Sequence, residues 1–208
     1  MTRKKTKDPC PICYLTRTLC ICDSIPTLDL KTRVCLIVHV NEVKRSSNTG
    51  RLALRALVNS EMRVRGETRE ALDLRDLLTD RYRTFLFYPS VDAVELDHEL
   101  VAQDETPIQL IVPDGTWRQA SKVRSRHHEL KDVPRVKISA PDRSNFHLRA
   151  QHRLDGMATL QAVAHALGVI EGDLVKAQLM KLYDAKVERT LIGRGLLSGN
   201  GAGFERQG

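Results

Sequence analysis

The sequence contains few aromatic residues, which limits the ways in which this protein could bind a nucleic acid. Tryptophan, tyrosine and phenylalanine together make up 4% of the 208 residues, and Trp117 is the only tryptophan. Single-stranded bases are usually held by stacking on aromatic side chains. If the partner is RNA, we therefore expect contacts to its backbone and shape, which favours a folded RNA.

Long apolar runs are absent as well. No stretch approaches the roughly 20 apolar residues that a membrane span needs, and no apolar segment follows the basic residues at positions 3–5. The sequence thus predicts no membrane association and no secretory signal. We expect a cytoplasmic protein whose five cysteines are reduced or metal-bound rather than paired in disulfides.

Several catalytic signatures are also missing. There is no Gly-rich loop ending in Gly-Lys-Ser/Thr, no nucleophile elbow and no internal repeat. Nucleotide hydrolysis therefore has no support. The glycine-rich residues 193–208 form no dinucleotide fingerprint, and we expect a flexible tail there.

Charge is unevenly distributed along the chain. The net charge is +7; basic residues concentrate in 44–69 and 118–137, and acidic ones in 67–80 and 92–105. A basic surface on one side of a protein is typical of nucleic-acid binding. The alternative is that these residues are ordinary solvated helix faces.

Four cysteines lie close together near the N-terminus, in the pattern Cys10-x2-Cys13-x6-Cys20-x-Cys22. Four thiolates can complete a tetrahedral zinc site, which a short segment with little core of its own needs for stability. A redox pair or incidental cysteines are the alternatives. Cys35 lies in an apolar run and is expected in the core.

Apolar periodicity predicts an α/β protein with a largely parallel sheet, because strand patterns alternate with helix patterns. Strands are expected at 33–39, 84–88, 108–112 and 135–139, and helices at 51–58, 69–78, 118–130, 157–167 (ended by Gly168) and 173–191. The last helix should bury Leu174, Leu179, Leu182 and Val187. We expect a cysteine segment (1–30), one main domain (31–192) and the tail (193–208).

The turn after the strand at 108–112 is the strongest candidate for a functional site. Its sequence is Pro113-Asp114-Gly115-Thr116-Trp117. It places a carboxylate at the carboxyl edge of the sheet, where open α/β proteins bind ligands. Alternatively, Asp114 or Thr116 caps the next helix and Trp117 anchors that helix in the core.

Basic side chains accompany two of the expected helices. Arg51 and Arg55 share a helix face, and Arg118, Lys122 and Arg126 form a stripe with four-residue spacing. An anion could bind at the start of the helix at 51–58, although an ordinary capped helix explains the same residues. The candidate RNA contacts are Lys44, Arg45, Arg51, Arg55, Arg118, Lys122 and Arg126.

Together, these segments resemble the DTW-domain family of tRNA-uridine aminocarboxypropyltransferases over roughly residues 10 to 170. The motifs that carry the resemblance are the four cysteines, His39 through Asn48-Thr49-Gly50 to Leu54, Phe87-Tyr88-Pro89-Ser90, Asp114-Gly115-Thr116-Trp117, and Ser144–Arg149 with Thr159–Ala162. Val40 and Gln161 depart from the pattern, standing where a Pro and a Glu are usual, and the Tyr usually found near Phe146 is absent.

The resemblance implies a fold related to the SPOUT class, with a C-terminal trefoil knot. It also implies transfer of the 3-amino-3-carboxypropyl group of S-adenosylmethionine to N3 of a tRNA uridine, leaving methylthioadenosine. Expected partners are therefore tRNA and S-adenosylmethionine, and the protein is expected to be a monomer.

The resemblance also implies roles for individual residues. Asp114 is the candidate general base for N3, or else it holds a ribose hydroxyl or the donor's ammonium group. Trp117 stacks on the adenine or packs the wall of its pocket. Donor-binding candidates are Pro89, Ser90, Gly115, Thr116, Trp117, Leu148, Arg149 and Thr159.

Two other functions stay open from the sequence. A SPOUT-type RNA methyltransferase would use the same donor but release S-adenosylhomocysteine. A zinc-containing RNA-binding module would carry out no chemistry and would bind no donor.

Overall fold

The computed structural model describes residues 8–67, 72–139 and 157–198. Among these, six strands form one sheet in the order β2-β1-β5-β3-β6-β4, with every neighbouring pair parallel. The strands are β1 (Arg33–His39), β2 (Ser60–Arg65), β3 (Arg83–Phe87), β4 (Val94–Glu95), β5 (Ile108–Asp114) and β6 (Arg135–Lys137). The predicted α/β class with a parallel sheet is confirmed.

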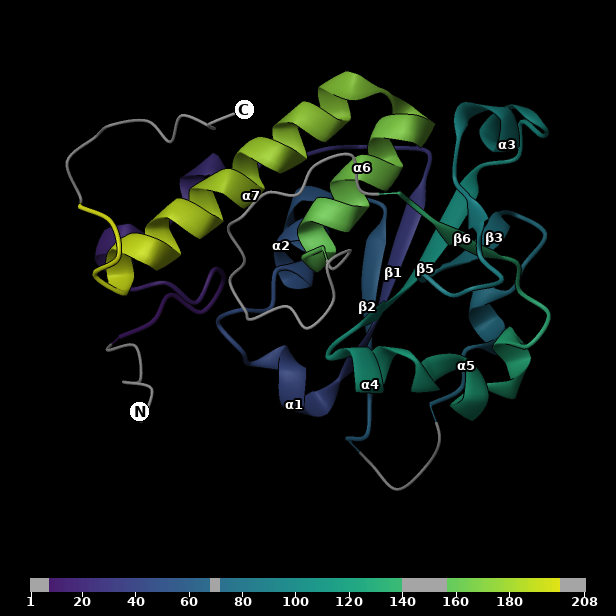
Figure 1. The fold of residues 1–208 in the computed structure, drawn as a ribbon, viewed down its shortest axis with the longest axis horizontal. Helices are drawn as coiled ribbons and strands as arrows, with labels where there is room; N and C mark the ends of the chain where they lie inside the picture. Colours follow the sequence, from purple (N-terminus) through teal and green to yellow (C-terminus); the bar gives the residue numbers. More distant parts are fainter. Residues whose placement is uncertain (1–7, 68–71, 140–156, 199–208) are drawn as a thin grey trace.

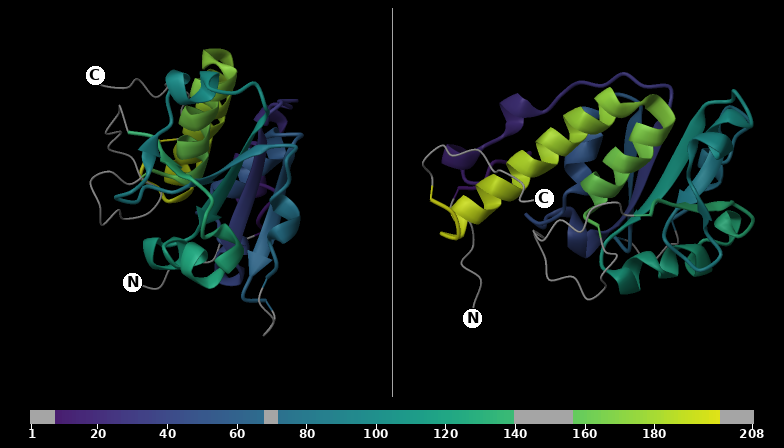
Figure 2. Two further views of the ribbon diagram at one scale, coloured as in Figure 1. Left: turned by 90° about the vertical axis from the view of Figure 1, so that its right-hand side faces the viewer. Right: turned by 45° about the horizontal axis from the view of Figure 1, so that its top comes forward.

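Two hydrophobic cores cover the two faces of the sheet, because successive side chains of a strand point in opposite directions. In β1, Leu36 and Val38 pack in the larger core, whereas Cys35 and Ile37 pack in the smaller one. The larger core includes three helices, which are α2 (Gly50–Ala56), α6 (Thr159–Glu171) and α7 (Asp173–Gly193). Figures 1 and 2 show α6 and α7 side by side over this face.

The smaller core is covered by short helical turns instead of long helices. These are η3 (Arg75–Leu77), α5 (Lys122–Arg126) and η4 (His128–Leu130). At the carboxyl edge of the sheet, β1 leads directly into α1 (Val40–Val43), and β5 leads through Gly115 into α4 (Trp117–Ala120). The remaining helices are η1 (Arg17–Leu19), η2 (Cys22–Ser24) and α3 (His98–Ala102).

Two predicted helices differ from the structure. In the described part of 69–78, only the 3-10 turn η3 forms, because the Asp73 carboxylate accepts a hydrogen bond from the Arg75 amide (3.0 Å) and competes with helical bonding. The predicted helix at 118–130 is divided into α4, α5 and η4. Leu77 and Leu130 are buried, although the backbone does not form continuous helices.

The prediction that Gly168 ends a helix was wrong. Helix α6 continues through Gly168, where a Cβ would lie 2.9 Å from the Cβ of Lys176, so glycine allows α7 to pack closely. The helix ends at Glu171, before Gly172, whose φ of +104° favours glycine. Leu174 is 82% exposed, contrary to prediction, while Leu179, Leu182 and Val187 are buried.

Two strands were missed. Strand β2 has a mixed polar sequence, Ser-Glu-Met-Arg-Val-Arg, because it lies at one edge of the sheet and is only partly buried. Strand β4, at the other edge, has only two residues. Edge strands bury less apolar surface than central ones, so neither of them contains the continuous apolar run that marked β1 and β5.

The N-terminal segment packs on the main domain rather than standing apart from it. Its buried residues Cys10, Cys13, Leu15 and Ile21 belong to the same core as α6 and α7. None of the described helices is long and apolar enough to span a membrane. Residues 140–156 and 199–208 lie outside the described residues, so the predicted tail (193–208) is described only as far as residue 198.

Candidate functional site

Asp114 is the buried centre of the candidate site. It is the last residue of β5 and lies opposite Val38 of β1. Its position alternates in step with Leu110 and Val112, so its side chain points to the same face, toward α2 and α6. Only 6% of Asp114 is exposed. The sheet therefore presents this carboxylate to the helices of the larger core.

Both oxygens of the Asp114 carboxylate accept hydrogen bonds from distant parts of the chain. Asn48 Nδ2 donates to Oδ2 at 2.6 Å, and Thr159 Oγ1 donates to Oδ1 at 2.5 Å. A third bond, from the Leu160 amide to Thr49 Oγ1 (3.2 Å), joins the two donor segments to each other. Three segments separated by many residues thus meet at one carboxylate.

Gly50 allows this close approach. A Cβ on Gly50 would lie 2.8 Å from Leu36 Cδ1 and 3.1 Å from Asp114 Oδ2. Both polar atoms of the nearby Asn48 side chain are held, because its Nδ2 donates to Asp114 and its Oδ1 accepts a hydrogen bond from the Arg51 amide at 3.2 Å. The turn before α2 therefore supplies a rigid donor to Asp114, a role that the sequence alone did not reveal.

The turn after Asp114 shows why Gly and Thr follow it. Thr116 caps α4 by accepting a hydrogen bond from the Gln119 amide, and the Gln119 side chain accepts the Thr116 amide in return. A Cβ on Gly115, whose φ is +152°, would lie 2.8 Å from Gln119 Oε1. Of the two caps considered from sequence, Thr116 is the one that forms, so Asp114 is not the helix cap.

Trp117 brings a second predicted motif to the same edge of the sheet. Its ring packs edge-to-face on Tyr88, with centroids 6.0 Å apart and planes at 62°. Tyr88 follows β3, the neighbour of β5, so the turn with Pro89 and Ser90 lies beside the turn that starts at Asp114. Ser90 Oγ is buried and makes no hydrogen bond with any residue that the structure describes.

The structure thus brings together most of the predicted donor-binding residues. Gly115, Thr116 and Trp117 adjoin Asp114 in the chain, and Thr159 is bonded to it. Ser90 lies in the neighbouring turn, which the packing of Tyr88 on Trp117 brings beside the Asp114 turn. Leu148 and Arg149 lie outside the described residues.

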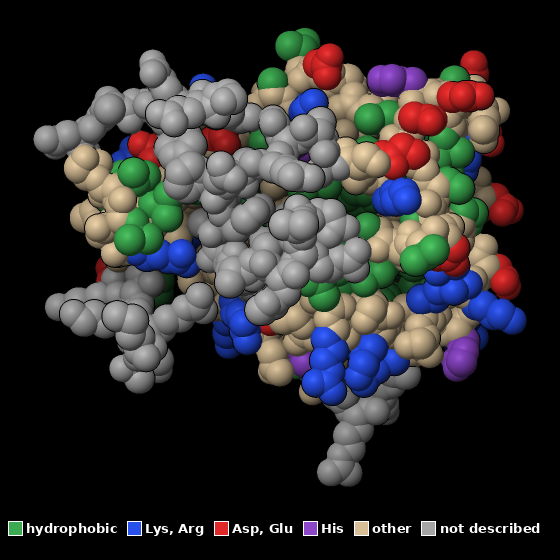
Figure 3. Space-filling model, in the orientation of Figure 1, with side chains coloured by type: hydrophobic (Ala, Val, Ile, Leu, Met, Phe, Trp, Pro, Cys, Tyr) green, Lys and Arg blue, Asp and Glu red, His purple; other side chains and the backbone are tan. Residues whose placement is uncertain are grey.

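Basic side chains gather at this edge of the molecule. Figure 3 shows Lys and Arg along the lower edge, over α4 and α5, and Asp and Glu mainly near α3. Six of the predicted RNA contacts are exposed, namely Lys44, Arg45, Arg55, Arg118, Lys122 and Arg126. Burial, together with the nearby Arg65 and Arg126, lowers the pKa of His39 at the end of β1. Arg118, Lys122 and Arg126 therefore place positive charge on the two helices that follow the Asp114 turn.

Arg51 differs from the other predicted RNA contacts because it is half-buried. Its guanidinium lies 4.0 Å from the centre of the Tyr14 ring and donates to the Val43 carbonyl at 3.3 Å. Burial lowers its pKa. These contacts join α2 to the cysteine segment, so Arg51 has a packing role that its charge alone did not indicate.

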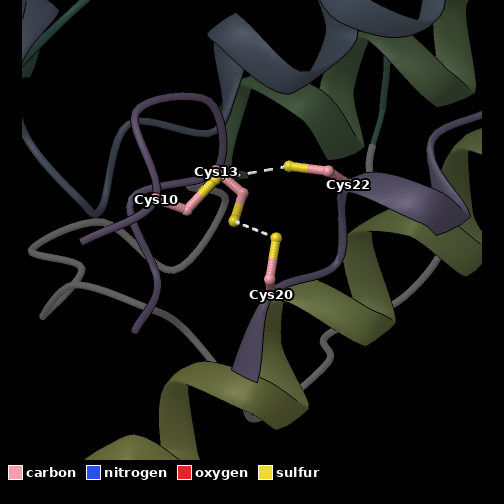
Figure 4. Close-up of side chains that lie close together, drawn as sticks. All are labelled: Cys10, Cys13, Cys20 and Cys22. Carbon is pink, nitrogen blue, oxygen red and sulfur yellow. Dashed lines mark hydrogen bonds between the residues drawn. The ribbon is translucent and has the colours of Figure 1, made fainter. Parts of the chain in front are cut away.

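The four N-terminal cysteines converge on one point (Figure 4). Their sulfur atoms all lie within 4.8 Å of one another, with Cys10 and Cys22 at 3.5 Å and Cys13 and Cys20 at 3.7 Å. A backbone hydrogen bond from Cys13 is the main cause that lowers the pKa of the Cys10 thiol to about 6. Four sulfurs in this arrangement can hold a metal ion. Cys35 lies apart in the core, as expected.

Lys186 was not expected near this cluster. It lies on α7, is fully buried, and donates from Nζ to the Cys13 carbonyl oxygen at 2.6 Å. Burial lowers its pKa to about 8. A signal was available in the sequence: Lys186 follows Leu179 and Leu182 at helical spacing, which places it on the buried stripe. Asn48 offered no comparable signal, because its partner Asp114 is 66 residues away.

The sequence of this chain is similar to those of known proteins. The DTW domain family matches residues 7–191. Three curated relatives bear the name tRNA-uridine aminocarboxypropyltransferase 2. The Drosophila melanogaster protein is 28% identical over 79% of this chain and 67% of its own length. The Macaca fascicularis and Mus musculus proteins are 24% and 25% identical over 80% and 78% of this chain. The matches span 58% and 56% of those two proteins. No solved structure matches significantly.

Proposed function

This chain belongs to the DTW domain family, and from that premise we propose that it is a tRNA-modifying transferase. In the proposed reaction, the 3-amino-3-carboxypropyl group of S-adenosylmethionine moves to N3 of a tRNA uridine and methylthioadenosine leaves. The observation that carries the proposal is the junction at Asp114, where three of the family's motif segments meet through hydrogen bonds from Asn48 and Thr159. The relatives' names support the same activity.

The donor is proposed to bind at the carboxyl ends of β3 and β5. Open α/β sheets bind ligands at this edge, and here it carries Ser90, whose hydroxyl lacks a described partner, beside Gly115 and Trp117. A half-buried tryptophan offers an apolar wall for the adenine. Holding the donor with its sulfonium in line with the attacking nitrogen would supply much of the rate enhancement.

For Asp114 itself, the geometry favours positioning over proton transfer. Two hydrogen bonds, from Asn48 and Thr159, fix the orientation of the carboxylate, as a group that positions a ligand requires. A carboxylate oxygen can accept more than one hydrogen bond, so Asp114 can also receive the donor's ammonium group or a ribose hydroxyl. General-base catalysis by Asp114 is the alternative.

Folded tRNA is proposed to lie across the basic edge. Arg118, Lys122 and Arg126 are exposed on α4 and α5, directly after the proposed donor turn. Phosphate contacts there would fix the register of the RNA without reading its sequence. The cytoplasmic location, the monomeric state, the SPOUT relationship and the C-terminal knot remain predictions.

We propose that the metal in the cysteine cluster is zinc. A tetrahedral site with Zn–S bonds of about 2.3 Å puts its sulfurs about 3.8 Å apart, and two pairs here are 3.5 and 3.7 Å apart. All four positions would be filled by Cys10, Cys13, Cys20 and Cys22. A closed set of four protein ligands is typical of structural sites, so zinc would stabilise the segment and take no part in the transfer.

The deciding experiment incubates purified protein with S-adenosylmethionine and unmodified tRNA, and then analyses both products by mass spectrometry. We expect aminocarboxypropyl-uridine in the tRNA and methylthioadenosine in solution. S-adenosylhomocysteine with a methylated nucleoside would instead identify a methyltransferase. If calorimetry detects tRNA binding but no donor binding, the protein is an RNA-binding module and the transferase proposal fails.

A further inference from the structure

The side chain of Lys186 is fully buried beside the cysteine cluster with little to compensate its charge. Its ammonium group makes one hydrogen bond among the residues that the structure describes, to the carbonyl oxygen of Cys13 at 2.6 Å. Within the same residues, no carboxylate lies within ion-pair distance of it. A buried charge without a counter-charge is strongly destabilising, so this lysine requires an explanation.

Other cationic groups near Lys186 make the burial of its charge still less favourable. Arg51 and Arg194 are both close enough to disfavour its charged form. Arg51 itself stacks on Tyr14, which directly follows Cys13. The groups near Lys186 that favour its charge are the thiols of Cys10 and Cys13. Lys186 and Arg51 therefore bring two cationic side chains to the segment that carries the four cysteines.

Metal binding would create the missing charge. Cysteine ligates zinc as a thiolate, so four cysteines and one Zn²⁺ together carry two excess negative charges. Such a cluster is also costly to bury unless cations lie near it. The cluster and the cations would each be destabilising alone and would compensate each other when zinc is bound.

We propose that Lys186 is the electrostatic counter-charge of the metal–thiolate cluster, so that zinc binding and the docking of the cysteine segment on α7 are coupled. This inference rests on the proposed zinc site and is independent of the transferase activity. Without metal, the buried ammonium group of Lys186 has only its hydrogen bond to the Cys13 carbonyl oxygen among the described residues. With metal, the helix supplies a cation that makes the cluster more favourable to bury.

The test compares three variants of the full-length protein. Lys186→Met removes the charge and the hydrogen bond, and Lys186→Gln removes the charge but keeps a donor for the Cys13 carbonyl. Lys181→Met is the matched control, because Lys181 lies on the same helix and is exposed. Zinc affinity is measured by competition with a chelator, and thermal unfolding is followed with zinc and after chelation.

We expect both Lys186 variants to bind zinc about 10-fold to 100-fold more weakly, the usual effect of losing a group that supports metal ligands. The zinc-induced rise in Tm should shrink in both variants, while chelated Lys186→Met should be at least as stable as the chelated native protein. Lys181→Met should match the native protein throughout.

Three results would overturn the coupling, and a fourth would overturn the zinc site on which it rests. If Lys186→Gln keeps native zinc affinity while Lys186→Met loses it, the hydrogen bond matters and the charge does not. If Lys186→Met lowers Tm equally with and without zinc, the lysine has an ordinary packing role. Native zinc affinity in both variants would also refute the coupling. A native protein that carries no zinc in elemental analysis would refute the zinc site itself, whatever its transferase activity.

Discussion

The cysteine cluster and the Asp114 junction are built in opposite ways. The cluster draws its four sulfurs from 13 consecutive residues, Cys10 to Cys22, and only its cationic surroundings come from elsewhere in the chain. The junction has one residue at its centre, and its partners Asn48 and Thr159 lie 66 and 45 residues away. The first site could be identified from spacing. The second required the order of strands in the sheet.

The two regions also handle buried charge differently. Within the described part of the chain, Asp114 accepts hydrogen bonds from two neutral donors, Asn48 and Thr159, so these contacts form without a ligand. Under the proposed coupling, Lys186 and the thiolates would compensate each other only with metal bound, so that region is expected to form only with its ligand. Metal removal should therefore affect the two regions unequally.

The largest expected effect comes from breaking the cluster. Cys13→Ser should abolish stoichiometric zinc binding and detach the N-terminal segment, because three thiolates leave the tetrahedral site incomplete. Elemental analysis should fall from about one zinc per chain to near zero, and amide hydrogen exchange should increase in residues 8–28. Cys35→Ala serves as the control and should retain zinc, since Cys35 packs in the other core. Retention of zinc by Cys13→Ser would contradict the four-cysteine site.

The next effect concerns the centre of the junction. Asp114→Asn can keep both bonds, with Oδ1 accepting from Asn48 and Nδ2 donating to the Thr159 hydroxyl. It removes the negative charge. If Asp114 anchors the donor, affinity for S-adenosylmethionine and turnover should both fall; if it is a base, turnover alone should fall by about 10²-fold or more.

Isothermal titration and single-turnover assays on Asp114→Asn separate these cases. Thermal unfolding should show little change, which confirms that the junction still forms. Full activity in this variant would mean that the Asp114 turn is not the chemical centre of the site.

Gly50→Ala tests how tightly the junction is packed without changing any of its donors. A Cβ would meet Leu36 and Asp114 at 2.8 and 3.1 Å, so we expect destabilisation by about 1–3 kcal/mol from overpacking. If the junction is loosely packed, Gly50→Ala should instead raise the free energy of unfolding, because Ala in a helix is favoured over Gly by about 0.5–1 kcal/mol. Denaturant unfolding measures the sign directly.

The smallest effect is expected at the basic edge. Lys122→Ala with Arg126→Ala should weaken tRNA binding and reduce its salt dependence by about two units of slope, one for each phosphate that is no longer neutralised. Donor binding should be unchanged. Lys181→Ala with Arg189→Ala removes the same charge from exposed positions on α7 and should have little effect. Equal binding by the two double variants would show that α5 is an ordinary solvated face.

Prediction of the fold succeeded where a strand is buried on both faces. Strand β1 was predicted at its observed bounds, and β5 within two residues, because central parallel strands need continuous apolar sequence. The prediction failed at the partly buried edge strand β2 and at the turn η3. In the first case burial was too weak to impose a pattern, and in the second Asp73 replaced helical bonding with a local hydrogen bond.

The sequence by itself determined the parallel α/β architecture, the convergence of four cysteines and the turn that carries Asp114. Each of these depends on residues that lie near one another in the chain, where periodicity and spacing reflect local geometry directly. Only the tertiary structure decided that Asn48 and Thr159 hold Asp114 and that Lys186 faces the cysteines. Those contacts arise from placing β5 between β1 and β3 and from packing α6 and α7 on one face of the sheet. No local pattern encodes which distant polar groups such packing brings within hydrogen-bond distance.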